Sequence, residues 1–93
     1  MAKLRSVSSA EIVLEVLRAI AAPAIVQGRE HVVFTKAQFI KAYWALRRQN
    51  RVPAVKIETL LRMLRKFAAE SEFLRYGRGR GGVYLLDTVR LPL

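Results

Sequence analysis

The feature that most constrains this chain is a glycine- and arginine-rich stretch near its C-terminus, EFLRYGRGRGGVYLL at residues 72–86. Two short apolar runs, 73–76 and 83–86, flank the glycines and contain residue types that suit strands. Because glycine readily takes the positive φ angles that a tight reversal needs, the stretch predicts a β-hairpin. Turning alone needs no arginine, so Arg78 and Arg80 at the tip predict contact with an anionic partner.

The region before the hairpin begins with a predicted helix over residues 10–22. Its start has a capping-box pattern, in which the Ser8 hydroxyl accepts from a backbone amide while the Glu11 side chain reaches back. Apolar residues then recur at helical spacing, and Pro23 is expected to end the helix. A β-prone run at 31–34 follows and predicts a small edge strand.

Two further helices are predicted between this strand and the hairpin. Thr35 and Gln38 form a second capping-box pattern, which opens a helix over 36–48. A polar turn that ends in Pro53 leads to a third helix over 54–70, whose apolar residues recur at i, i+3, i+4 and i+7. The sequence therefore predicts an α+β fold of three helices with a short strand and a C-terminal β-hairpin.

The composition excludes several classes of function. The 93 residues are predicted to form a single domain over 1–93, with a core over about 8–87. The chain has no cysteine, one histidine and one aspartate, so we expect no metal, no cofactor and no catalytic site, and no enzyme is predicted. No run reaches the roughly 18 apolar residues of a membrane span, and acidic residues enter too early for a secretory signal. The expected location is the cytoplasm.

The net charge of +10 is unevenly distributed along the chain. Residues 1–35 contain four Lys and Arg against three Asp and Glu, whereas residues 36–93 contain 13 against four. This asymmetry predicts a surface that binds a polyanion such as nucleic acid. The apolar fraction of 53% is also high for so short a chain, so a homodimer is predicted through the first helix and the C-terminal tail.

The order of these elements resembles the winged helix-turn-helix family of DNA-binding domains, over roughly residues 8–87. In that family the second and third helices form the helix-turn-helix, the short strand pairs with the hairpin, and the hairpin is the wing. One departure is the turn at 49–53, which is longer than the usual turn of about three or four residues. The resemblance implies a small transcriptional regulator that binds double-stranded DNA with full or partial sequence specificity.

The resemblance also implies roles for individual residues. Arg62 on the recognition helix would bond a guanine edge, or else pair with Glu58, and the other basic residues of that helix would contact phosphates. The wing arginines would reach phosphates or a narrow minor groove. Backbone amides near Thr35 and Lys36 are expected to hold a phosphate as well. The predicted interface comprises Lys56, Thr59, Arg62, Arg65 and Lys66 in the third helix, Arg75, Arg78 and Arg80 in the wing, and Lys36, Lys41, Arg48 and Arg51 in the second helix and turn.

Two other functions are consistent with the same residues. The glycine–arginine segment also suits an RNA-binding or ribonucleoprotein component, although it has no further repeats. The high apolar content also suits a winged-helix adaptor that binds proteins of the replication or transcription machinery. The sequence leaves Trp44 open to packing under the first helix, a dimer contact or base stacking, and residues 91–93 open to a disordered tail or a dimer arm.

Overall fold

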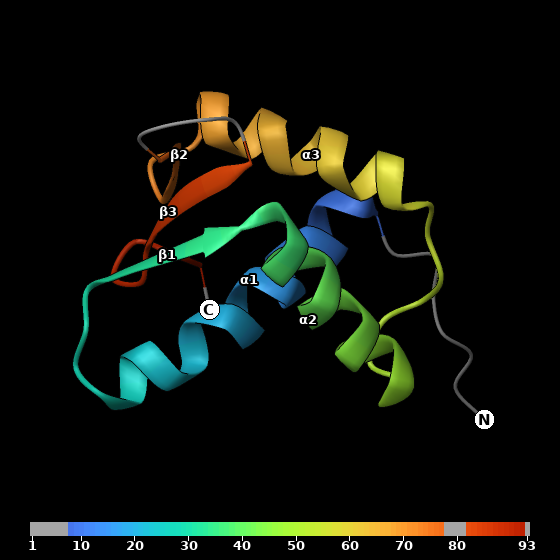
Figure 1. Cartoon of the computed structure of the whole chain (residues 1–93), viewed down its shortest axis with the longest axis horizontal. Coiled ribbons are helices and arrows are strands. Elements are labelled where there is room, and N and C mark those ends of the chain that lie inside the picture. Colours follow the sequence, from blue (N-terminus) through green and yellow to red (C-terminus); the bar gives the residue numbers. More distant parts are fainter. Residues whose placement is uncertain (1–7, 78–81, 93) are drawn as a thin grey trace.

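The computed structural model describes residues 8–77 and 82–92 of the chain. Within them the protein is a small α+β domain of three helices and a three-stranded antiparallel sheet (Figure 1). The elements in chain order are α1 (Ser9–Val26), β1 (His31–Thr35), α2 (Lys36–Arg48), α3 (Ile57–Glu70), β2 (Leu74–Tyr76) and β3 (Val83–Asp87). The predicted class, the edge strand and the hairpin strands are confirmed.

Helix α1 is longer than the sequence predicts. Its start is as expected, since the Ser8 hydroxyl accepts from the amide of Glu11 at 3.2 Å. The expected end at Pro23 is wrong, because the helix continues to Val26. Pro23 lies on the exposed side of the helix, where its missing N–H removes one backbone hydrogen bond. The next residue, Ala24, is 4% exposed and extends the buried face of the helix beyond the proline. None of the described helices is of a length and hydropathy that would let it traverse a bilayer.

Helix α2 has the predicted bounds, and its capping box is complete. The amide of Gln38 donates to the Thr35 hydroxyl at 3.1 Å, and the amide of Thr35 donates to the Gln38 side chain at 2.8 Å. Both bonds join residues three positions apart, so the local sequence alone specifies them.

Helix α3 begins at Ile57, later than the predicted Ala54. The cause is Tyr43 on α2, whose buried hydroxyl accepts from the amide of Val55 at 2.9 Å and lies 3.3 Å from the carbonyl of Pro53. These bonds satisfy backbone groups of the connection outside a helix. The connection between α2 and α3 is therefore residues 49–56, longer again than the predicted turn.

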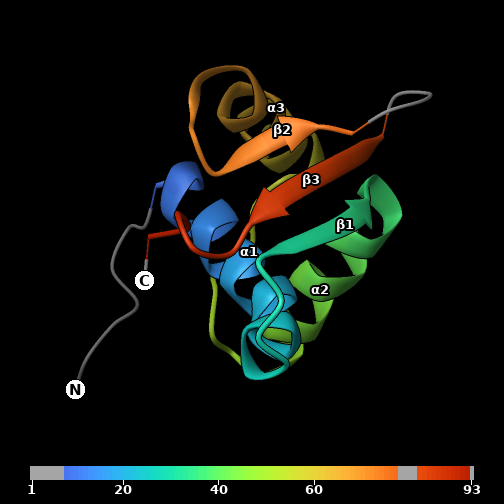
Figure 2. The same cartoon turned by 90° about the vertical axis from the view of Figure 1, so that its left-hand side faces the viewer.

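The sheet has the strand order β1-β3-β2, so β3 is central and β1 lies at one edge (Figure 2). The hairpin pairs Leu74 with Leu86 and Tyr76 with Tyr84, and the amide of Gly77 donates to the carbonyl of Val83 at 2.8 Å. The tip of the hairpin at residues 78–81 lies outside the described residues.

The C-terminal tail is part of the folded body. Leu91 is 3% exposed and belongs to the main core, and the Arg18 side chain donates to the carbonyl of Pro92 at 2.9 Å. Asp87 accepts from the amides of Val89 and Arg90, which turns the chain back toward α1. Neither a disordered tail nor an extended arm describes Leu91 and Pro92.

Candidate nucleic-acid interface

The recognition helix predicted from the sequence and the hairpin lie side by side. The hydroxyl of Tyr76 on β2 donates to the main-chain carbonyl of Arg65 on α3 at 3.4 Å. Closer to the start of β2, the rings of Phe67 and Phe73 have centroids 5.5 Å apart. Figures 1 and 2 both show α3 next to β2, with the hairpin extending from that junction. One extended partner can therefore reach both elements.

The start of α2 joins the same region. The amide of Lys36 donates to the carbonyl of Gly82 at 2.6 Å, and a Cβ on Gly82 would lie 3.8 Å from that of Lys36. We call the region formed by Lys36, Arg65, Tyr76 and Gly82 the junction surface. It combines two exposed basic side chains with an exposed aromatic ring, a composition suited to a sugar-phosphate strand.

A row of aromatic rings crosses the sheet beneath the junction surface. Phe34, Tyr84 and Tyr76 are register partners on β1, β3 and β2. The first two rings have centroids 5.5 Å apart at 19°, and the last two 5.7 Å apart at 33°. Phe34 and Tyr84 are buried, whereas Tyr76 is 52% exposed. The row thus begins in the core and ends at the surface beside Arg65.

Burial raises the pKa of Tyr84, Tyr76 raises it further, and the positive charge of Arg65 opposes both. A phenol whose pKa is higher in the folded state favours folding below its unfolded pKa of 10.0, and this contribution is lost as the pH rises through the folded pKa. We therefore expect the free energy of unfolding to fall above about pH 10, and Tyr84→Phe to remove part of that fall. Denaturant unfolding of both proteins from pH 8 to about 11 measures this, and identical pH profiles would contradict it.

The predicted residues of α3 spread over its exposed side, with Arg65 about 60° around the helix from Arg62 in one direction and Lys66 about 40° in the other. Arg62 and Arg65 are exposed, and Arg62 forms no salt bridge with Glu58. Lys66 follows Arg65 by one residue and so lies about 100° around the helix. It lines a shallow, mostly apolar hollow with Ala10, Met63, Phe67, Glu70 and Ser71, on the side of the α1 N-terminus. Lys56 is exposed at the N-cap and Thr59 is half-buried.

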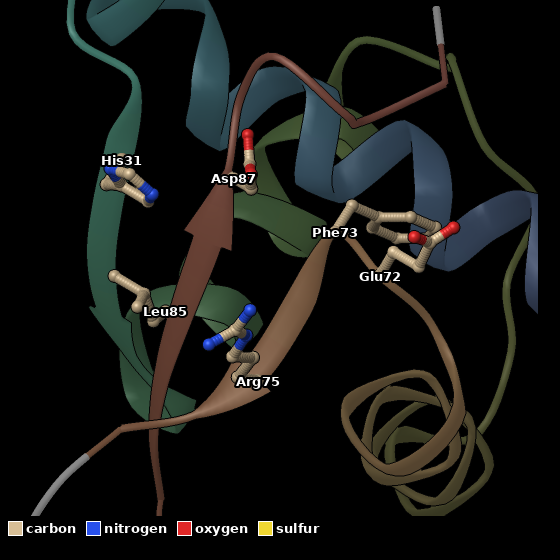
Figure 3. A pocket seen from close by; sticks show the side chains of 6 residues that line it. All are labelled: His31, Glu72, Phe73, Arg75, Leu85 and Asp87. Atoms are coloured by element: carbon tan, nitrogen blue, oxygen red, sulfur yellow. The ribbon is translucent and has the colours of Figure 1, made fainter.

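Arg75 is on the face of the sheet opposite α3. Side chains alternate along β2, so Leu74 and Tyr76 face the helices and Arg75 faces outward. Figure 3 shows Arg75 beside Leu85 and near Asp87 on that outer face, where they line a small hollow with His31, Glu72 and Phe73. The structure therefore does not bring Arg75 together with Arg65. Arg78 and Arg80 lie outside the described residues.

The residues predicted on α2 and the turn are spread over a wide area. Lys41 and Arg48 are exposed. Arg48 is 12 residues after Lys36, so these two residues lie about 18 Å apart along the helix. Arg51 lies 3.7 Å from Glu15 on α1, so its charge is partly compensated there. Only Lys36 of this group belongs to the junction surface.

The amides of Thr35 and Lys36, near which a phosphate was expected to bind, already have partners in the fold. The amide of Thr35 donates to Gln38 and that of Lys36 donates to Gly82. Both donors are therefore used within the fold. Neither of these two amides is therefore free to donate to a phosphate.

Tyr76 belongs to the junction surface but not to the interface predicted from the sequence. The sequence predicts Tyr76 only as a strand residue, although its place two positions after Leu74 puts both on the same, helix-facing side of β2. Arg47 is half-buried, donates to the carbonyl of Val52 at 3.2 Å, and has an Nε atom without a hydrogen-bond partner. No pattern in the sequence distinguished it from Arg48. Trp44 packs against Tyr43 at 5.3 Å between ring centroids and is 47% exposed.

The described residues contain no group of three or more His, Cys, Asp or Glu placed to hold a metal ion. Comparison of the chain with protein-family models, with curated proteins and with solved structures gave no match. The junction surface and the distribution of charge are therefore the features of this chain that indicate a partner.

Proposed function

We propose that this protein is a winged-helix domain that binds double-stranded DNA as a small transcriptional regulator. In this proposal α3 enters the major groove, the β2–β3 hairpin contacts the flanking backbone, and Lys36 contacts a phosphate between them. The observation that carries it is the contact of Tyr76 with Arg65, because it holds the basic helix against the basic hairpin. The net charge of +10 supports a polyanionic partner.

The proposal predicts steep salt dependence. Each phosphate neutralised by Lys or Arg releases counterions, which lowers the logarithm of the affinity by about 0.9 per logarithmic unit of salt. With at least about six phosphate contacts, the slope should be about −5 or steeper. Fluorescence anisotropy of a labelled duplex, titrated between about 50 and 200 mM salt, measures the slope. A slope near zero would contradict the proposal.

The nucleic-acid class is tested by selection and competition. DNA and RNA oligonucleotide libraries are offered together, and the bound molecules are sequenced. We expect the selection to enrich duplex DNA. Structured RNA of equal length should displace this DNA only poorly in the competition. Preferential recovery of RNA would replace the proposal with an RNA-binding function, since A-form RNA does not admit a helix into its deep, narrow major groove. Weak binding of both, with a protein partner recovered instead, would favour the adaptor function.

A further inference from the structure

The free edge of β1 is the strongest unassigned feature of the molecule. In the described part of the chain β1 has β3 on one side and no strand on the other (Figure 2). It pairs with β3 over five residues without a bulge, and it contains no proline, lysine or arginine. Natural sheets often protect an edge strand with a bulge, a proline or a charged side chain such as lysine.

The ladder shows which backbone groups of β1 are free. The amide of Thr88 donates to the carbonyl of Glu30 at 2.9 Å, and the amide of Lys36 donates to that of Gly82. Hydrogen-bonded pairs alternate in an antiparallel ladder, so the backbone groups of His31, Val33 and Thr35 point to the open edge. The Thr35 amide donates to Gln38, and its carbonyl accepts the first hydrogen bond of α2, so the free backbone groups are those of His31 and Val33.

We infer that β1 is a dimerisation edge and that it pairs antiparallel with β1 of a second copy, centred on Val33. In this register the two Val33 residues exchange both backbone hydrogen bonds, and each His31 lies across from Thr35 of the second copy. The result is a continuous sheet through both copies. The inference does not rest on the proposed DNA binding.

Charge identifies the occupant as a second copy. Residues 30–35 and 83–89 contain no Lys or Arg, although the chain carries 17 of them. A copy with a net charge of +10 is therefore repelled least at this edge. The register centred on Val33 also places the acidic Glu30 of each copy near the N-terminus of α2 of the other, where a negative charge is favourable. Strand β1 itself contains no Lys or Arg that could bind a polyanion.

Exposed apolar side chains add to the pairing. Val33 is 62% exposed and lies beside its register partner Leu85 on the outer face. In the dimer the two Val33 side chains meet at the twofold axis and remove each other from water. So few contacts predict a weak dimer, with a dissociation constant on the order of 10–100 µM.

The absence of cysteine allows a direct test on the full chain, without nucleic acid. A residue at the twofold axis faces itself at a Cα separation of about 5.5 Å, which a disulfide spans. We expect oxidised Val33→Cys to give at least about fivefold more covalent dimer than Val26→Cys or Val89→Cys. Val26 and Val89 are 87% and 72% exposed, so accessibility favours these controls. Equal or greater cross-linking of a control would overturn the inference.

Sedimentation equilibrium provides the second measurement. In roughly 0.5 M salt, which screens repulsion between the copies, the unaltered chain should show a monomer–dimer equilibrium. Val33→Lys places like charges opposite each other and should weaken dimerisation about tenfold or more, while its exposed position preserves the fold. Circular dichroism checks the fold, and Val33→Thr serves as the control that keeps the dimer. A purely monomeric parent chain, or a dimer unaffected by Val33→Lys, would refute the edge pairing.

Discussion

Replacing Arg62 with alanine is expected to weaken binding to the selected duplex by about 5- to 100-fold and to change binding to unrelated duplexes far less. The reason is that a bidentate arginine–guanine contact contributes about 1–3 kcal/mol of discrimination against a wrong base. Arg62 is exposed on α3 and free of a salt bridge with Glu58, so its guanidinium is available to a base edge. Anisotropy titrations with the selected duplex and with scrambled duplexes of the same length measure both effects.

Arg65→Ala is the informative comparison on the same helix. Only the main-chain carbonyl of Arg65 accepts from Tyr76, so truncation of the side chain leaves that contact in place. We expect Arg65→Ala to weaken all duplexes alike and to reduce the salt slope by about one unit, as for a phosphate contact.

Arg90→Ala controls for the loss of net charge alone. Arg90 pairs with Glu72 at 3.2 Å and lies 3.7 Å from Asp87, away from the junction surface. It should change affinity little for any duplex. Equal losses from Arg62→Ala and Arg90→Ala on every sequence would reduce the interface to general electrostatic attraction.

The elements that the sequence predicts well are specified by residues close together in the chain. The capping box of Thr35 and Gln38 sets the start of α2, and the two β-prone runs pair as the strands of the hairpin. The boundaries that were wrong depend on distant partners. Helix α3 starts late because the Tyr43 hydroxyl, 12 residues away, holds the Val55 amide. Burial of Ala24 carries α1 past its proline.

The composition of the candidate interface was easier to predict than its geometry. Charge and element order identify the basic residues, but each residue's direction depends on how α3 lies on the sheet. The close contact of Tyr76 with Arg65 shows which side of β2 faces the helix, and it separates Arg75 from that side. Lys66 likewise turns toward the α1 N-terminus, because one residue rotates a helix by about 100°. Such relations come from packing between elements and have no local signature.

The row of aromatic rings beneath the junction surface gives the largest expected effect on stability. Phe34 is 2% exposed, and its ring lies 5.5 Å from that of Tyr84 and 6.3 Å from that of Phe39. Phe34→Ala removes the buried end of this row and leaves a cavity that rigid neighbours fill poorly. We expect the free energy of unfolding to fall by about 3–5 kcal/mol, a large part of the total for a small domain. Urea unfolding followed by circular dichroism measures it.

Val33→Ala is the matched control, one residue earlier on the same strand. Its side chain is 62% exposed on the outer face, so the loss should stay below about 1 kcal/mol at protein concentrations too low for dimers. The contrast between adjacent positions separates burial in the aromatic row from the general strand preference of a β-branched or aromatic residue. If the two variants lose the same stability, the row does not anchor β1 to the core. In that case the contact between α3 and β2 would be the remaining interaction that could hold the junction surface in place.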